Sequence, residues 1–191
     1  MTKVRMNLPN IITLARILLI PVFVLIYLAP GQWTYATAAI FFGLAAFTDW
    51  LDGYLARRLN QTTPFGAFLD PVADKLIVVS ALVLLIANHH NIWLTLPALI
   101  IVGREIVISA LREWMAEMNS SGAVAVSMLG KVKTTVQMIA ITMLLAVDPV
   151  TYEGWVIGLS FFMLYAAAVL TLWSGFVYLR AAWKVLEERQ N

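Results

Sequence analysis

Long apolar segments recur along the whole 191-residue chain, and they restrict its fold more than any other feature. Each is close to the length of about 17–25 residues that a helix needs to cross a bilayer. Because lipid offers no hydrogen-bonding partners to the backbone, such segments form helices rather than open strands. We therefore expect an all-α, polytopic membrane protein with six transmembrane helices, at residues 11–29, 34–57, 66–88, 92–114, 128–147 and 155–179.

The composition agrees with a membrane protein. Only 13% of the residues are charged, whereas soluble domains average roughly a quarter. The chain has no cysteine, which excludes disulfides and thiolate metal ligands. No linker or change of composition divides the sequence, so we expect a single membrane domain over residues 1–191.

The basic residues predict the orientation of this domain. The expected loops at about 29–34, 88–93 and 148–155 contain no lysine or arginine, so all thirteen basic residues fall toward the other side. Basic residues mark the cytoplasmic side of membrane proteins. We expect both termini to be cytoplasmic, and the absence of a transit peptide before the first span favours a bacterial inner (plasma) membrane.

Four aspartates interrupt the apolar pattern around the connection between the second and third spans. Asp49 and Asp52 lie near the cytoplasmic end of one span, and Asp70 and Asp74 lie in the first turns of the next. Spacings of three and four residues place each pair on one helix face. Because the connection is short, the two helices should be antiparallel neighbours, and the four carboxylates can converge just below the cytoplasmic surface.

Four carboxylates at such close range need counter-charge. Arg57 and Lys75 supply part of it, and divalent cations would supply the rest. Oxygen ligands without histidine or cysteine suit Mg²⁺ or Mn²⁺, and a site of this kind can hold two ions about 4 Å apart. We expect such a cation site, with solvated charges at helix ends as the alternative. For the small residues Gly53 and Ala56, the pattern alone favours close helix packing.

The spacing of these residues resembles a known signature. The pattern reads Asp49-x-x-Asp52-Gly53-x-x-Ala56-Arg57 and, after eight intervening residues, Gly66-x-x-x-Asp70-x-x-x-Asp74. It resembles the motif of the CDP-alcohol phosphatidyltransferase family. NIITLAR (10–16), GREIVISALREWMAE (103–117) and GKVKTT (130–135) resemble the branch of that family that uses sn-glycerol 3-phosphate and forms phosphatidylglycerophosphate.

The resemblance implies an activity, partners and residue roles. CDP-diacylglycerol would donate its phosphatidyl group to the acceptor alcohol in the bilayer, and CMP would leave. Family members are typically homodimers, and we expect no nucleic-acid partner. Carried over to this sequence, the roles are metal ligation by Asp49, Asp52, Asp70 and Asp74, base catalysis by Asp74, lining of the cytidine pocket by Gly53 and Ala56, and nucleotide contact by Arg57.

An acceptor that carries phosphate needs cationic side chains. Arg104 and Arg112 are eight residues apart, close to two helical turns, and should share one face of the fourth span. Arginine forks and lysines are usual phosphate ligands. The residues that we expect at the acceptor phosphate are Arg104, Arg112, Lys131, Lys133, Thr13 and Arg16, the last two from a family position facing the site.

Simpler or different interpretations remain for these features. The basic residues could serve only topology and local pairing with glutamates, and Arg104 could pair with a motif aspartate. The acceptor could be inositol phosphate, serine or phosphatidylglycerol, because the aspartate motif is shared by enzymes that use them. A cation transporter is the alternative from another class, although the acidic residues all lie at one end of the expected spans.

Overall fold

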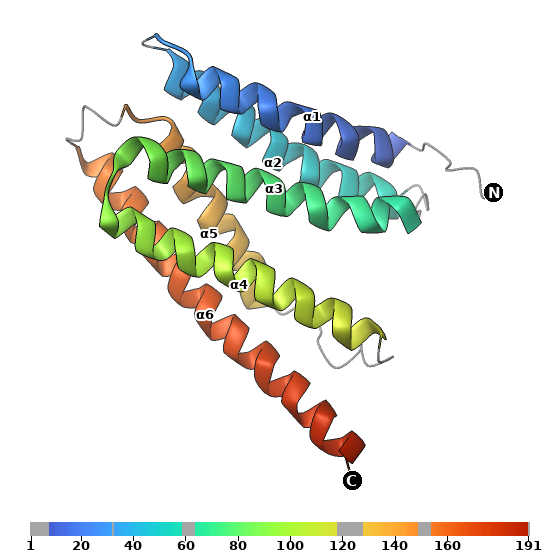
Figure 1. Ribbon diagram of the computed structural model, residues 1–191. Helices are drawn as coiled ribbons and strands as arrows, with labels where there is room; N and C mark the ends of the chain where they lie inside the picture. The colour runs from blue at the N-terminus through green and yellow to red at the C-terminus, as the bar shows by residue number, and fades with distance from the viewer. Residues whose placement is uncertain (1–7, 32, 59–63, 118–127, 149–153, 191) are drawn as a thin grey trace. The chain divides into compact units, whose positions relative to one another are not determined.

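The computed structural model describes residues 8–31, 33–58, 64–117, 128–148 and 154–190. Regular secondary structure within these ranges is helical (Figure 1). The helices are α1 (Leu8–Leu28), α2 (Thr34–Arg58), α3 (Pro64–His89), α4 (Ile92–Glu117), α5 (Met128–Leu145) and α6 (Trp155–Gln190). The all-α prediction is confirmed, with one helix at each expected position.

The largest error in the expected boundaries is at the end of α6. We expected the span to end at residue 179, whereas the helix continues to Gln190. Hydropathy reports only the apolar part of a helix, and the last turns of α6 are polar. A hydrogen bond of 2.6 Å from Trp183 Nε1 to Glu187 Oε1 joins residues one turn apart in this extension. The start of α3 also differs from the expected one, because the helix begins at Pro64 rather than Gly66. Proline suits the first turn of a helix, where a backbone N–H would have no partner within the helix.

Three of the described helices are long and apolar enough to cross a membrane. They are Asn10–Leu28, Ile92–Glu117 and Trp155–Trp183, and the apolar part of α5, Val132–Leu145, is shorter. Length and composition of these helices fit a membrane protein. The six-span arrangement and its orientation stay predictions.

The chain divides into two compact units. One contains Met1–His89 and Ile141–Ile157, and the other contains His90–Ala140 and Gly158–Asn191. The expectation of a single domain over residues 1–191 stays a prediction.

In the first unit, α1, α2 and α3 lie side by side, and consecutive helices run in opposite directions (Figure 1). Phe23 and Phe42 meet edge to face, with ring centroids 6.1 Å apart. Ala38, Ala73 and Ala81 are fully buried, and such small residues let helices approach closely. The predicted antiparallel pairing of α2 and α3 is confirmed. As a result, the start of α1, the end of α2 and the start of α3 lie at the same end of this unit.

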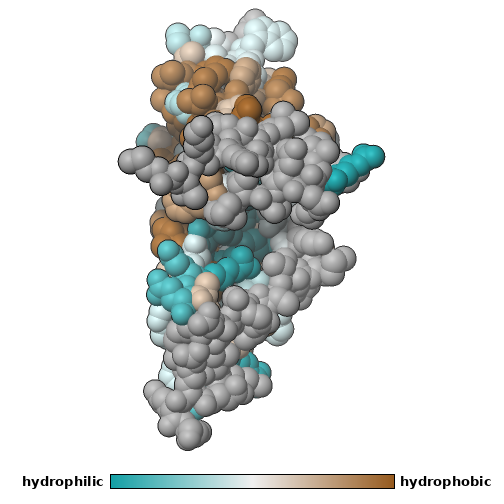
Figure 2. Space-filling view, turned by 90° about the vertical axis from the view of Figure 1, so that its right-hand side faces the viewer, coloured by the Kyte–Doolittle hydropathy of each residue, from teal (hydrophilic) through white to brown (hydrophobic). Residues whose placement is uncertain are grey.

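The outer surface of the first unit is apolar. Leu18, Leu25 and Ile40 are each at least 60% exposed. Figure 2 shows hydrophobic residues, in brown, gathered in its upper part, over the unit that contains α1. A large apolar surface of this kind usually marks contact with a membrane or another protein.

In the second unit, α4 and α6 each carry a stripe of buried residues with a seven-residue spacing. On α4 the stripe consists of Leu94, Ile101, Ile108 and Met115, each at most 3% exposed. On α6 the residues with this spacing are Leu164, Thr171 and Tyr178, which are also buried. In this unit α4 and α6 run in the same direction and α5 runs against them (Figure 1). Two side chains of the α6 stripe, Thr171 and Tyr178, are polar although they are buried.

Candidate functional site

A buried arginine from α1 connects the aspartates of α2 and α3. Arg16 Nη1 donates hydrogen bonds to Asp49 Oδ1 at 2.7 Å and to Asp74 Oδ1 at 2.9 Å. The Arg16 side chain is 0% exposed, whereas those of Asp49 and Asp74 are 43% and 50% exposed. The guanidinium thus lies beneath the two carboxylates, which remain accessible from outside.

The third described aspartate also contacts α1. The hydroxyl of Thr13, a buried residue, donates a hydrogen bond of 2.9 Å to Asp70 Oδ1. Thr13 and Arg16 are three residues apart and share a helix face, as do Asp70 and Asp74, which are four apart. One face of α1 therefore meets one face of α3, and α1 forms a wall of the acidic cluster.

These contacts partly confirm the predicted geometry. Asp49 and Asp74 do converge, because both lie within hydrogen-bonding distance of a single nitrogen atom. Thr13 and Arg16, which we expected at the acceptor phosphate, contact the aspartates in this structure. Arg16 was not among the residues expected to balance the carboxylates. A role for Thr13 and Arg16 in acceptor binding stays a prediction.

Several expected site residues lie where the side chains are not described. Asp52, Gly53, Ala56 and Arg57 belong to α2 by their backbone, but their side chains lie outside the described residues, as does that of Lys131 on α5. Among the described residues, no three histidine, cysteine, aspartate or glutamate side chains are grouped as a metal site. The four-aspartate site therefore stays a prediction.

The described carboxylates nevertheless fit a hard divalent cation in their chemistry. Asp49 and Asp74 bring oxygen ligands together from two helices, and both are half-exposed. Oxygen ligands are those that Mg²⁺ and Mn²⁺ prefer. Arg16 carries one positive charge against the three carboxylates of Asp49, Asp70 and Asp74, so a divalent cation at this place would add counter-charge.

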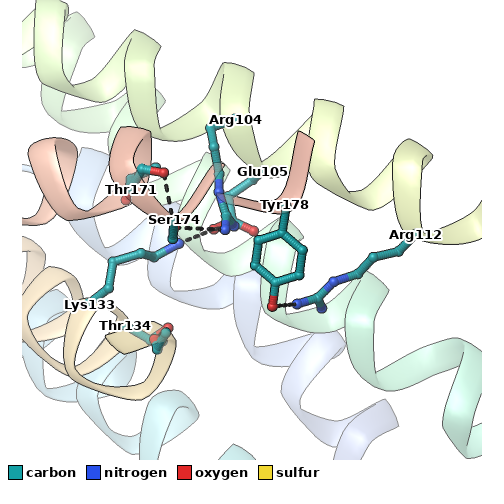
Figure 3. A network of polar contacts seen from close by, with 9 residues as sticks. Arg104, Glu105, Arg112, Lys133, Thr134, Thr171, Ser174 and Tyr178 are labelled. Atoms are coloured by element: carbon teal, nitrogen blue, oxygen red, sulfur yellow. Dashed lines mark hydrogen bonds and ion pairs between the residues drawn. The ribbon is translucent and has the colours of Figure 1, made fainter. Parts of the chain in front are cut away.

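The second unit contains a cluster with the opposite charge, shown in Figure 3. Lys133 Nζ on α5 donates a hydrogen bond of 2.7 Å to Glu105 Oε1 on α4. The neighbouring Arg104 reaches the same oxygen atom at 3.5 Å. The Lys133 side chain is only 4% exposed, and Glu105 supplies the counter-charge that a buried ammonium needs.

Side chains from α6 complete this basic cluster. Arg104 Nη2 donates to Ser174 Oγ at 2.9 Å, and Arg112 Nη2 donates to Tyr178 Oη at 2.7 Å. The Cζ atoms of Arg104 and Arg112 lie 5.6 and 4.9 Å from the centroid of the Tyr178 ring. The prediction that the two arginines share one face of α4 is confirmed, because both reach the same ring.

The described partners of Arg104 and Arg112 bear on whether these arginines serve only local pairing with glutamates. Arg104 pairs with its neighbour Glu105, as the local-pairing interpretation expected, and its other described hydrogen bond goes to Ser174. Arg112 bonds to Tyr178 instead of the adjacent glutamates that we considered. Binding of the acceptor phosphate by Arg104, Arg112 and Lys133 stays a prediction.

Three residues of this cluster were not among the predicted site residues: Glu105, Ser174 and Tyr178. The sequence did contain a signal for the two residues of α6. Thr171, Ser174, Gly175 and Tyr178 follow the spacing of one helix face within an otherwise apolar segment. Small or polar residues repeated on one face of such a helix often mark contact with polar groups of another helix.

Comparison with known proteins identifies the family. The family model described as CDP-alcohol phosphatidyltransferase matches residues 6–173. A curated protein from Pseudomonas fluorescens is 56% identical over 184 residues, covering 95% of this chain and 93% of that protein. Proteins from Escherichia coli (strain K12) and Shigella flexneri are 53% identical over 176 residues, covering 92% of this chain and 94% of theirs. All three are named CDP-diacylglycerol--glycerol-3-phosphate 3-phosphatidyltransferase. The chain therefore belongs to the CDP-alcohol phosphatidyltransferase family.

Proposed function

We propose that this protein transfers the phosphatidyl group of CDP-diacylglycerol to sn-glycerol 3-phosphate, forming phosphatidylglycerophosphate and releasing CMP. The observation that carries the proposal is identity of 53–56% to bacterial proteins named for this reaction, over more than nine-tenths of the chain. The two charged clusters support it, since the reaction brings together a pyrophosphate donor and a phosphate-bearing acceptor.

The acidic cluster is the reaction centre in this proposal. Asp49, Asp52, Asp70 and Asp74 hold one or two divalent ions, Mg²⁺ or Mn²⁺. When bound, such ions stabilise negative charge on the donor phosphates and on the departing CMP. Arg16 fixes the direction of the Asp49 and Asp74 carboxylates by bonding one oxygen atom of each.

Asp74 is the proposed general base. As the acceptor hydroxyl attacks the phosphorus atom that carries diacylglycerol, its proton passes to the Asp74 carboxylate, and the bond from phosphorus to CMP breaks. The side chain of Asp74 is half-exposed, so an acceptor can reach it. Thr13 holds Asp70 one turn away, which keeps the α3 face of the site in place.

The remaining proposed contacts concern the two substrates. Gly53 and Ala56 admit the cytidine of the donor, and Arg57 contacts its phosphates. Arg104, Arg112, Lys131 and Lys133 bind the acceptor phosphate, with Thr13 and Arg16 near the acceptor. This basic set favours an acceptor that carries phosphate over serine, because charged donors bond most strongly to anionic oxygen atoms.

The membrane arrangement is also part of the proposal. Six helices span a bacterial inner membrane, both termini and the reaction site face the cytoplasm, and the protein acts as a homodimer. The acyl chains of the donor then stay in lipid while its head group meets a soluble acceptor. The exposed apolar side chains of α1 and α2 and the three long apolar helices support this arrangement.

A comparison of acceptors tests the function. Purified protein in lipid nanodiscs receives CDP-diacylglycerol, Mg²⁺ or Mn²⁺, and in parallel sn-glycerol 3-phosphate, inositol phosphate, serine or phosphatidylglycerol. We expect CMP release and a lipid product with glycerol 3-phosphate, and no release after chelation. Faster release with another acceptor would replace the acceptor assignment. No release with any acceptor would reject the enzyme and leave cation transport, measured as Mn²⁺ uptake into vesicles, as the next test.

A further inference from the structure

We propose that Tyr178 on α6 is a positioning residue that fixes Arg104 and Arg112 for the acceptor phosphate, an inference that rests on the proposed function. Tyr178 is 8% exposed. Its hydroxyl and its ring are both engaged by neighbouring side chains, and we therefore place its effect on the substrate in those neighbours. Its neighbours are the two arginines of α4 that lie two turns apart.

The ring of Tyr178 holds both guanidinium groups through its face and its hydroxyl. The Cζ atoms lie 5.6 Å and 4.9 Å from the ring centroid, within the range of cation–π attraction. Arg112 is exposed, and its bond of 2.7 Å to the Tyr178 hydroxyl restricts a side chain that otherwise has many rotamers. Two long cationic side chains are thus directed toward one region of the α4 surface.

Ser174 supplies the second part of this support. Its hydroxyl donates its one proton to the carbonyl oxygen of Thr171 at 3.0 Å. The oxygen lone pairs of Ser174 therefore remain to accept the bond from Arg104 Nη2 at 2.9 Å. Gly175 lies against Arg104 as well, since a Cβ atom placed there would be 3.4 Å from Arg104 Cγ. One face of α6 thus sets the conformation of Arg104 along its length.

Prior positioning matters because an arginine side chain loses conformational entropy when it binds an anion. Fixing a flexible side chain before binding removes that cost and raises affinity. Arg104 also has a donor in reserve. Its Nε is buried and has no hydrogen-bond partner among the described residues. Loss of the support should therefore weaken binding of the acceptor while the donor binds as before.

The test measures both Michaelis constants in Tyr178→Phe and Tyr178→Leu. Tyr178→Phe removes only the hydroxyl, and Tyr178→Leu also removes the ring. Because Tyr178→Leu removes a hydrogen bond to a charged group, we expect KM for glycerol 3-phosphate to rise about tenfold or more in this variant. Tyr178→Phe should recover part of that loss, and KM for CDP-diacylglycerol should stay unchanged in both. Tyr165→Phe, an exposed tyrosine of the same helix, is the matched control and should behave as wild type.

The outcomes separate this inference from the proposed function. If wild-type protein releases no CMP with glycerol 3-phosphate, the proposed function fails before any variant is compared. If the wild type is active and both Michaelis constants rise together, or the acceptor constant is unchanged, positioning by Tyr178 is wrong. Should Tyr178→Leu fail to fold, Tyr178→Phe decides alone, because it preserves the shape of the buried ring.

Discussion

The acidic cluster of the first unit and the basic cluster of the second have opposite arrangements of charge. In the first, one buried cation, Arg16, lies beneath exposed aspartates. In the second, one acid, Glu105, bonds to a buried Lys133 and the adjacent Arg104. Among the described side chains, each cluster thus contains an opposite charge that bonds to two of its members. The difference teaches that a shared counter-ion can link like charges in an acidic and in a basic cluster alike, and the proposed function assigns cations to the first cluster and anions to the second.

The largest effect should come from Asp74→Asn, which keeps the shape of the side chain but removes its ability to accept a proton. We expect the turnover rate to fall by roughly 10²–10⁴-fold, the usual contribution of a general base. CMP release under saturating substrate is the measurement. Asp148→Asn, in the turn after α5, is the control for loss of one carboxylate and should leave turnover near wild type. Near-normal activity of Asp74→Asn would rule this residue out as the base.

The next effect concerns the basic cluster and should differ in kind. Lys131→Ala with Lys133→Ala should raise KM for glycerol 3-phosphate by about tenfold or more, because charged hydrogen bonds are lost. KM for CDP-diacylglycerol should change much less. Arg180→Ala, an exposed cation of α6, controls for the change in net charge. If both substrates lost affinity equally, the acceptor assignment of these lysines would be wrong and the contrast between the clusters would disappear.

Arg16→Gln tests whether the buried cation holds the acidic cluster together. We expect the free energy of unfolding to fall by about 1.5–2 kcal/mol, the lower part of the range for charged hydrogen bonds, because solvent screens the half-exposed aspartates. Thermal unfolding in detergent is the measurement, with Arg58→Gln, an exposed arginine of α2, as control. Added Mg²⁺ should reduce the difference between Arg16→Gln and wild type. A cost that adds fully to that of Asp49→Asn in the double variant would contradict direct coupling.

The smallest effect is expected for Gly175→Ala. The added methyl group would meet Arg104 Cγ at 3.4 Å, an ordinary van der Waals contact. We therefore expect KM for glycerol 3-phosphate to change by less than about twofold and the unfolding temperature to stay equal or rise slightly, since alanine favours a helix over glycine. Gly175→Leu, which is too large for this space, should raise KM for glycerol 3-phosphate. Equal behaviour of the two variants would show that Arg104 is not held against α6.

Much of the fold and part of the site could be predicted from local patterns. Apolar segments of sufficient length predict helices, and spacings of three, four and eight residues predict shared faces. For this reason the helices, the convergence of Asp49 with Asp74 and the common face of Arg104 and Arg112 were predictable. Each of these depends on one helix or on two helices joined by a short connection.

The contacts that sequence analysis missed join distant parts of the chain. Arg16 meets partners 33 and 58 residues away, and Arg104 and Arg112 meet residues of α6 that are 70 and 66 residues away. The face that α1 or α6 turns toward another helix depends on packing, and mostly apolar helices carry little signal for it. A polar residue in such a helix predicts that a partner exists, but not which one.

The position of Arg16 near the start of the chain has a consequence for biosynthesis. Every contact that links Thr13 and Arg16 to the aspartates lies within the first 74 residues. Since chains fold from the amino end as they emerge from the ribosome, the contacts of the acidic cluster can form once the third helix has been made. The carboxylates then receive their internal counter-ion while the segments that carry Arg104, Arg112 and Lys133 are still being translated.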